Sequence, residues 1–496
     1  MTSDIKQTKY EFLSEDPTVK VMPIVLSLII GAFFATLNET LLNIALTTLM
    51  TEFSISIATV QWMATGFMLV MGIVIPISAL LLQWFTTRQL FLSTMIVFTL
   101  GTVICASAPT FSILLIGRFL QAVGTGLLTP IIFHIFLLLF PPQRRGTIMG
   151  IIGLVFMFAP AIGPTLSGVI VEYLGWRYLF IIVIPFACFS IIFAYKFLVN
   201  VSDVTRPKID ILSIVFSTIG FGCVVFGFSS AGEAGFLHPT VYLSITIGVI
   251  SIICFSIRQF KLEEPILNLR VFKFPMFRIG VVIYIIIIMA MLSSEVILPM
   301  YLQGPLALSA AAAGLVLLPG SILNGIMSPV MGNLFDKFGP RKLLIPAAFI
   351  LSATLFILSR ISLQTPVWLI IVCYILLMIS VSAIMMPTQT NALNQLPKQL
   401  YAHGTAVLTT LQPVAGAVGV SIFVGLMTAR QNNLLKKTTP PIDAAIFNET
   451  FVAGVNLVYL IAFGLAVISL IFSLFVHRAT PAEMENKEQS SSLDLT

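Results

Sequence analysis

The sequence predicts an all-α polytopic membrane protein with fourteen transmembrane helices. Of its 496 residues, 58% are hydrophobic and only 9% are charged, whereas about 25% of the residues of a soluble domain are charged. The hydrophobic residues occur in runs, and a run of about 20 residues spans a bilayer as a helix. Fourteen such runs can be distinguished. The composition therefore excludes a soluble enzyme, a nucleic-acid-binding protein and a secreted disulfide-bonded scaffold.

The predicted helices follow one another along almost the whole chain. They span residues 21–46, 57–81, 89–108, 111–139, 146–171, 177–198, 211–230, 240–257, 279–302, 312–335, 342–360, 366–388, 403–428 and 454–476. Each contains an apolar stretch long enough to cross a bilayer. The seventh helix is rich in glycine and serine, and an alternative count of twelve would omit the seventh and eighth.

The basic residues indicate how the helices are oriented, because Lys and Arg accumulate in cytoplasmic loops. If both termini are cytoplasmic, 20 of the 26 Lys and Arg lie in cytoplasmic segments, five lie outside and Arg118 lies within a helix. This asymmetry predicts that both termini face the cytoplasm. The polar first residues do not form a cleavable signal peptide.

The cysteines and histidines predict neither metal binding nor redox chemistry. The five cysteines are single residues in apolar runs, without the close spacing of a metal or redox pair. The four histidines are scattered, and the chain has neither the paired catalytic residues of a membrane enzyme nor a phosphate-binding loop for ATP. The formal net charge of +6 comes from scattered residues and indicates no nucleic-acid partner. We expect no metal and no cofactor.

The two halves of the chain contain an internal repeat. Residues 76–88 align with residues 329–341 at a constant offset of 253, with matching proline, small residue, phenylalanine and arginine. Many secondary transporters have duplicated halves, with the substrate site between them. The predicted segments are a cytoplasmic tail (1–20), an N-terminal six-helix half (21–200), a linker with two extra helices (201–275), a C-terminal six-helix half (276–478, with an external loop at 429–453) and a cytoplasmic tail (479–496).

A polar motif follows the tenth predicted helix. It reads Gly332-Asn-Leu-Phe-Asp336-Lys-Phe-Gly339-Pro-Arg341-Lys, which resembles the loop signature of the major facilitator superfamily. We expect Asp336 to pair with Arg341 or to accept hydrogen bonds from a neighbouring helix N-terminus, and so to latch the cytoplasmic ends together. The alternative is an ordinary solvated loop charge.

The first half of the repeat predicts a weaker latch. Arg88 matches Arg341, but Gln83 stands where the second half has Asp336. Because the amide carries no charge, we expect the cytoplasmic gate to depend more on Asp336 than on Gln83.

The fifth predicted helix is rich in small residues. Gly150, Ala159, Gly163, Pro164 and Gly168 resemble the antiporter signature of the same superfamily. Small residues at steps of three and four allow another helix to approach closely. The resemblance implies a seam that prevents leakage during exchange, whereas the alternative is tight packing without that consequence.

The fourth predicted helix contains a charge within the membrane. The sequence Arg118-x-x-Gln121-Ala-x-Gly124-x-Gly126 resembles another pattern of this superfamily. A charge at the centre of a membrane helix costs about 3 kcal/mol on insertion scales, so Arg118 should face protein or water. The alternative is that its side chain extends to the outer membrane surface. For His134, deeper in the same helix, we favour a neutral residue over a proton carrier.

Two carboxylates lie well inside predicted helices. Glu39 in the first helix and Glu295 in the ninth occupy equivalent positions of the two repeats, so we expect both to face one central cavity. Members of the branch of this superfamily that the chain resembles often have Leu-Asp-x-Thr-x-x-Asn in the first helix. Here Asn38 precedes Glu39, and Asn43 follows. The acid is therefore displaced by one residue, which is about 100° around the helix.

The resemblance covers essentially the whole chain and is to the fourteen-helix drug:proton antiporter branch of the superfamily. It implies a major facilitator fold and a monomeric exporter of amphipathic or cationic organic compounds in the plasma membrane of a bacterium. The proton gradient would supply the energy. One alternative is an exporter of an endogenous lipid, peptide or metabolite. A membrane enzyme is a weaker alternative, because the chain lacks the residues such an enzyme needs.

Overall fold

We analysed a computed structural model of the chain. It describes residues 20–55, 57–60, 62–201, 204–205, 207, 209–437 and 443–479. The predicted tails, 1–20 and 479–496, therefore lie almost wholly outside the described residues. Within these residues the chain is helical and contains no β-strand, as the sequence predicts.

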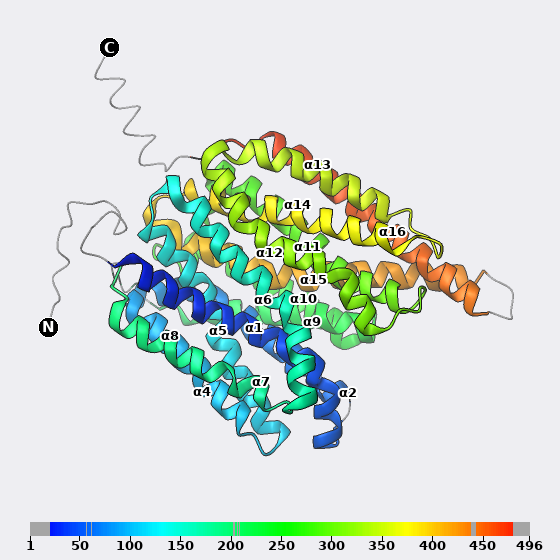
Figure 1. Ribbon diagram of the computed structural model, residues 1–496. Coiled ribbons are helices and arrows are strands. Elements are labelled where there is room, and N and C mark those ends of the chain that lie inside the picture. The colour runs from blue at the N-terminus through cyan, green and yellow to red at the C-terminus, as the bar shows by residue number, and fades with distance from the viewer. Residues whose placement is uncertain are drawn as a thin grey trace, which may run out of the picture.

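The α-helices follow the order of the predicted segments (Figure 1). The first half contains α1 (Val21–Phe53), α2 (Ile57–Val60), α3 (Trp62–Trp84), α4 (Thr87–Ala106), α5 (Phe111–Leu139), α6 (Arg145–Tyr173), α7 (Tyr178–Ile181) and α8 (Val183–Phe197). The inserted pair consists of α9 (Ile211–Ala234) and α10 (Pro239–Lys261). The second half contains α11 (Pro275–Gln303), α12 (Ala310–Phe338), α13 (Pro340–Leu358), α14 (Val367–Asn394), α15 (Tyr401–Leu435) and α16 (Ala444–Leu474).

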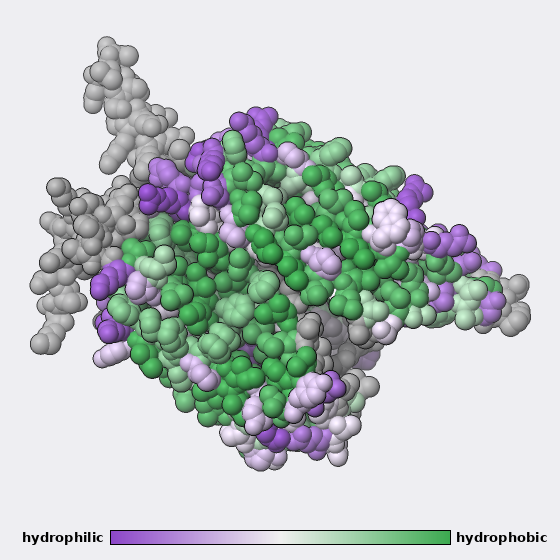
Figure 2. All heavy atoms as spheres, viewed as in Figure 1, coloured by the Kyte–Doolittle hydropathy of each residue, from purple (hydrophilic) through white to green (hydrophobic). Residues whose placement is uncertain are grey.

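Thirteen helical segments in the described part of the chain are long and apolar enough to cross a membrane, so this is a multi-pass membrane protein. The predicted count of fourteen is not matched exactly. The helix that is absent from the thirteen is the fifth predicted one. It corresponds to the 29-residue α6, and several side chains of α6 lie outside the described ones. Figure 2 shows apolar side chains over the middle of the visible face, whereas polar side chains gather toward the ends.

The external loop predicted at 429–453 is much shorter in the structure. α15 continues to Leu435 and α16 already begins at Ala444. Asp443 caps α16, because its carboxylate accepts a hydrogen bond from the N–H of Ile446 at 2.8 Å. The predicted loop is the stretch between two hydrophobic runs, and helices extend into it from both sides because polar residues also form helices.

The helices outside the inserted pair form two lobes, α1–α8 and α11–α16. α1 begins and α16 ends at the same end of the bundle (Figure 1), which we call the termini end; the opposite end is the far end. The α6–α12 and α3–α15 pairs join the lobes. In Figure 1 the lobes lie together at the termini end and spread apart toward the far end.

The inserted helices pack against the seam between the lobes. α9 contacts α3 of the N-terminal lobe and α15 of the C-terminal lobe. Gly72 on α3 lies against Val225 on α9, and the hydroxyl of Ser421 on α15 donates to the carbonyl of Phe228. The pair therefore covers one side of the α3–α15 contact.

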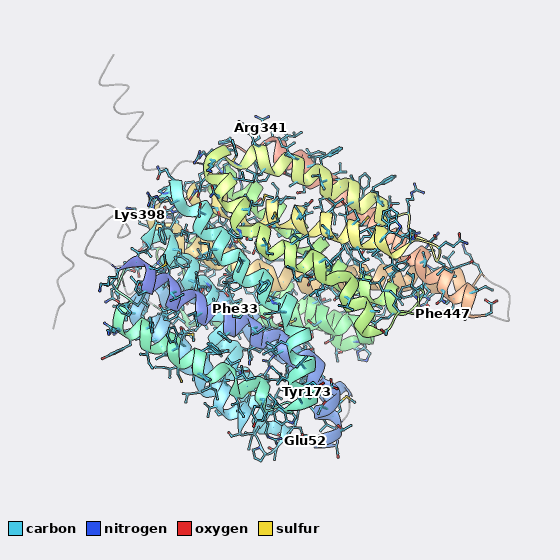
Figure 3. All side chains as sticks on the ribbon, in the orientation of Figure 1. Phe33, Glu52, Tyr173, Arg341, Lys398 and Phe447 are labelled. Carbon is cyan, nitrogen blue, oxygen red and sulfur yellow. The ribbon has the colours of Figure 1, made fainter. Side chains whose placement is uncertain are left out.

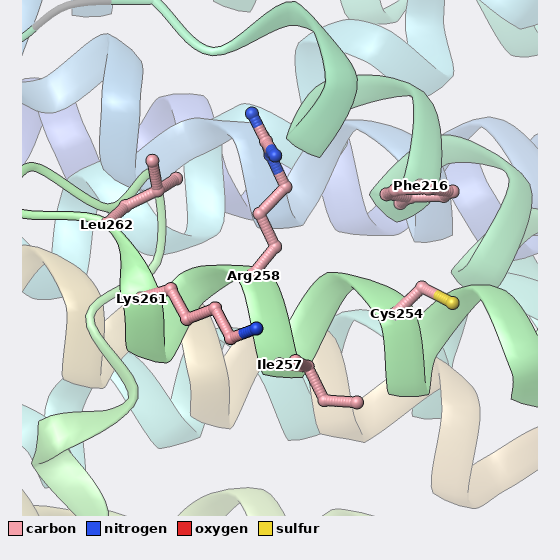
Figure 4. Close-up of a pocket in the computed structure, with 6 residues that line it drawn as sticks. All are labelled: Phe216, Cys254, Ile257, Arg258, Lys261 and Leu262. Carbon is pink, nitrogen blue, oxygen red and sulfur yellow. The ribbon is translucent and has the colours of Figure 1, made fainter.

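An ion pair joins the two inserted helices at the termini end. The guanidinium of Arg258 donates to both carboxylate oxygens of Asp210 at 2.6 and 2.8 Å, and this interaction lowers the pKa of Asp210 to about 2. A shallow pocket beside it is lined by Phe216, Cys254, Ile257, Arg258, Lys261 and Leu262 (Figure 4). Because all six residues belong to the inserted pair or directly follow it, this pocket is not between the lobes.

Candidate functional site

A buried polar cluster surrounds Arg118 on α5. Arg118 is 1% exposed, and its Nη1 donates to the side-chain oxygens of Asn38 at 3.0 Å and Gln121 at 3.2 Å. The ring of Phe67 on α3 lies 4.2 Å from the guanidinium carbon, a distance typical of cation–π contacts. The sequence leaves open whether Arg118 faces protein or the membrane surface, and the structure places it inside the N-terminal lobe.

Glu39 lies beside this cluster on α1 and is partly buried. Its charge interacts with that of Arg118, although the two do not form one of the ion pairs found among the described residues. Nε of Arg118 has no hydrogen-bond partner in the described part of the chain. The side chain of Asn43 lies outside the described ones. A proton gained or lost by Glu39 therefore changes the charge that faces Arg118.

Glu295 lies on α11, the counterpart of α1 in the repeat. Its side chain is exposed and interacts electrostatically with Tyr374 on α14. Among the described residues no interaction joins Glu295 to Glu39. Each carboxyl thus lies among groups of its own lobe, and a cavity shared by the two stays a prediction.

Toward the far end, the small residues of α6 contact α1. A Cβ atom on Gly163 would lie 2.2 Å from the hydroxyl oxygen of Thr40, and the hydroxyl of Ser167 donates to the carbonyl of Leu41. Thr40 and Leu41 directly follow Glu39 in the chain. The segment that carries the carboxyl is therefore packed directly on α6.

Toward the termini end, α6 contacts α12 of the opposite lobe. A Cβ atom on Gly150 would lie 2.7 Å from Cα of Pro329, a distance that only glycine permits. Ala159, farther along α6, is fully buried. The side chains of Pro164 and Gly168 lie outside the described ones. The small residues of α6 thus allow close contact with one helix of each lobe.

Asp336, near the end of α12, accepts hydrogen bonds from the first turn of α6. Its Oδ1 accepts from the N–H of Gly146 at 2.8 Å, and its Oδ2 accepts from the N–H and the hydroxyl of Thr147, each at 2.7 Å. The first N–H groups of a helix lack partners within the helix and carry partial positive charge. Of the two partners considered for Asp336, the structure places the helix N-terminus against it and not Arg341.

The first half of the repeat makes a corresponding contact without a carboxylate. Gln83 on α3 lies with its Nε2 3.2 Å from Nε2 of His403 on α15. His403 is the third residue of α15, as Thr147 is the third residue of α6. The two contacts between the lobes are therefore related by the repeat, and they differ in charge.

Three further residues of the predicted gate stay within their own lobes. Gly339 connects α12 to α13 with a φ of 78°, a backbone region that favours glycine. Arg88 donates to the carbonyl of Tyr195 and lies over its ring. The side chain of Arg341 is exposed on the C-terminal lobe (Figure 3). In the described part of the chain, it makes no hydrogen bond.

Arg145, the first residue of α6, is a gate residue for which the sequence indicates only a loop charge. It is 0% exposed. Within its own lobe it donates to the carbonyls of Leu137 at 2.6 Å and Phe140 at 3.1 Å. Across the interface its Nη1 donates to the side-chain oxygen of Asn394 at 3.0 Å and to the hydroxyl of Tyr401 at 3.1 Å. Arg145 therefore connects the end of α5 to α14 and α15.

These contacts between the lobes lie at the termini end. Gly332 packs directly on Gly146, because a Cβ atom there would lie 2.1 Å from the Gly146 carbonyl oxygen. At the far end, Glu52 and Tyr173 of the N-terminal lobe lie well apart from Phe447 of the C-terminal lobe (Figure 3). The structure therefore has its lobes closed at the termini end and separated at the far end.

Two repeated helical lobes, with a buried charged cluster in one and a closed contact between them at one end, define a secondary membrane transporter. Residues 28–420 match the sequence model of the Major Facilitator Superfamily, and the chain belongs to this family. It is therefore a transporter and not an enzyme.

Two relatives and one solved structure cover nearly the whole chain. Lincomycin resistance protein LmrB of Bacillus subtilis (strain 168) is 52% identical over 461 residues, which are 92% of this chain and 96% of that protein. LmrB of Listeria monocytogenes serovar 1/2a (strain ATCC BAA-679 / EGD-e) is 49% identical and covers 93% and 98%. The structure of the proton:xylose symporter XylE aligns with a TM-score of 0.61 at 15% identity, covering 93% and 96%. That likeness shows the fold alone.

Proposed function

We propose that the protein exports amphipathic or cationic organic compounds, antibiotics among them, in exchange for protons. The similarity to two proteins named for lincomycin resistance supports a drug as cargo. The buried Arg118 cluster beside Glu39 carries the proposal of proton coupling. Ionisable groups inside membrane-spanning helices are costly, and they commonly mark ion and proton pathways.

The packing of α1 on α6 can transmit the effect of protonation at Glu39 to the gate. The residues after Glu39 contact Gly163 and Ser167 on α6, so a shift of α1 on protonation moves α6. The first turn of the same helix holds Arg145 and Thr147, which close the termini end. We propose that protonation of Glu39 loosens this closure and that loss of the proton restores it.

In this proposal the termini end faces the cytoplasm of a bacterium. The distribution of basic residues supports this orientation. The structure then represents the state that is closed to the cytoplasm, in which cargo leaves toward the outside. We propose that one copy of the chain suffices for the cycle, with the proton gradient as energy source and no cofactor.

Reconstitution into proteoliposomes with an imposed pH gradient tests this function. The probes are lincomycin and the lipophilic cation tetraphenylphosphonium. We expect both to accumulate against their gradients only while the pH gradient lasts, and an uncoupler should stop this accumulation. Probe accumulation that does not depend on the pH gradient would contradict proton coupling. Failure to move either probe would contradict drug export.

Replacing Gly332 with alanine is expected to reduce the transport rate several-fold. The added methyl group would meet the Gly146 carbonyl and Cα of Gly150, so the lobes must separate, although alanine alone stabilises a helix by about 1 kcal/mol relative to glycine. The matched control is Gly464→Ala on α16, where nothing lies within 4 Å of the new Cβ atom. Initial rates at equal membrane abundance measure the effect, and equal rates for both variants would contradict it.

A further inference from the structure

A small cavity of about 10 Å³, with room for about one water molecule, lies between the two lobes behind the closed gate. Its wall includes Phe133 and Phe156 of the N-terminal lobe and Tyr284, Met386, Gln389 and Gln412 of the C-terminal lobe. The lining contains aromatic rings, thioethers, amides and the hydroxyls of one threonine and one tyrosine, but no charged side chain. The cavity is therefore chemically different from the Arg118 cluster.

Gln389 on α14 has a buried amide without a protein partner. It is 1% exposed, yet neither its Oε1 nor its Nε2 forms a hydrogen bond within the described part of the chain. Leaving a buried polar group unpaired destabilises a folded protein. Most buried polar groups in proteins are paired, so an exception calls for an explanation. When the lobes separate and the cavity widens, a ligand that enters it can supply the missing partner.

The cavity and the charged cluster lie at different distances from the termini end. Gln389 is five residues before the end of α14, and Tyr284 is nine residues after the start of α11. At 1.5 Å per residue, these positions are about 8 and 14 Å from the helix ends at the termini end. Glu39 is 18 residues after the start of α1, which places it about 27 Å from that end. The amide cavity is thus closer to the gate.

The helices that form the gate also form the wall of this cavity. Met386 on α14 lies against Gly153 on α6, and Phe156 on α6 stacks on Phe133 at a centroid distance of 6.2 Å. Eight residues beyond Met386, Asn394 accepts the hydrogen bond from Arg145. Separation of α6 from α14 at the gate would therefore open the cavity to the termini end.

We infer that this cavity is a cargo subsite that recognises an uncharged hydrogen-bonding group, such as an amide or a hydroxyl, on an apolar molecule. The amides of Gln389 and Gln412 offer both donors and acceptors. The rings and the flexible methionines provide apolar contacts that adapt to different shapes. This inference rests on the proposed export function and adds that neutral polar contacts select cargo at a place separate from the proton-binding carboxyl.

Gln389→Leu tests the inference, because leucine has an apolar side chain of similar volume and lacks both amide atoms. The probes in proteoliposomes are chloramphenicol, which is uncharged and carries amide and hydroxyl groups, and tetraphenylphosphonium, which has no hydrogen-bonding group. We expect the KM for chloramphenicol to rise at least tenfold and the KM for tetraphenylphosphonium to change less than twofold. Gln412→Leu should act in the same direction.

The control is Gln431→Leu. Gln431 is a buried amide on α15 that donates to the carbonyl of Phe447 at 3.4 Å near the far end. The substitution should leave both KM values unchanged. We also expect Gln389→Leu to keep or raise the Tm without cargo, because it removes an unpaired buried group. Equal losses for both probes, or no change for either, would overturn the inference. A wild-type protein that moves neither probe would instead overturn the proposed function.

Discussion

Replacing Arg145 with methionine is expected to open the termini end and to lower the transport rate at least tenfold. The guanidinium donates hydrogen bonds within its own lobe and, across the interface, to Asn394 and Tyr401. A hydrogen bond to a charged group contributes about 1.5–3 kcal/mol, and a tenfold change in an equilibrium constant corresponds to about 1.4 kcal/mol. Loss of the two bonds across the interface therefore suffices for a large shift in population.

Spin labels at Gln143 and Gln399 can measure this opening, since both side chains are exposed and each lies on a different lobe at the termini end. Arg145→Met should lengthen the distance between the labels, whereas Arg144→Met, the same change at the exposed neighbouring residue, should leave it unchanged. Tyr401→Phe removes one acceptor and should give a smaller shift of the same sign. An unchanged distance in Arg145→Met, with transport retained, would show that Arg145 does not hold the gate.

Hydropathy could locate most helices because the bilayer requires long apolar segments, but it could not locate their ends. α1 is predicted to end at residue 46 and continues to Phe53, and α15 continues to Leu435. Outside the bilayer a helix no longer needs apolar residues, so the hydrophobic run and the helix end at different places. The helix count differs for another reason, since the described side chains of α6 are interrupted by several that lie outside the described ones.

The sequence indicates those gate residues that belong to one short motif. Asp336 and Gly332 belong to one motif, and the repeat relates Asp336 to Gln83. Arg145 has no such signal, because its partners Asn394 and Tyr401 lie 249 and 256 residues away and only tertiary structure brings them together.

Gln389 could not be recognised from the sequence for the same reason. Gln389 directly follows the predicted helix 366–388 and stands among other polar residues, Thr388, Thr390 and Asn391, so the sequence does not single it out. That it lacks a partner, and that the opposite lobe completes the cavity around it, are properties of the assembled bundle.

Replacing Glu39 with glutamine is expected to abolish export driven by a pH gradient while the protein stays folded in the membrane. Glutamine keeps the shape of the side chain but can neither carry the charge that faces Arg118 nor exchange a proton. Exchange of labelled for unlabelled cargo without a gradient should continue, because the hydrogen bond from Arg118 to Asn38 does not depend on the Glu39 carboxyl. Uphill accumulation and cargo exchange, measured on the same proteoliposomes, therefore separate coupling from binding.

Glu52→Gln is the matched control, because it makes the same change on the same helix. Glu52 lies at the far end, is exposed, and accepts hydrogen bonds from Trp176 at 2.6 Å and Arg177 at 2.8 Å, so its loss should leave gradient-driven export nearly unchanged. Glu295→Gln tests the carboxyl of the second lobe in the same way. Normal gradient-driven export by the double variant Glu39→Gln/Glu295→Gln, at equal membrane abundance, would eliminate coupling through these carboxyls. The proton would then have to be carried at the Arg118 cluster or at His134, a buried residue whose Nδ1 has no partner among the described residues.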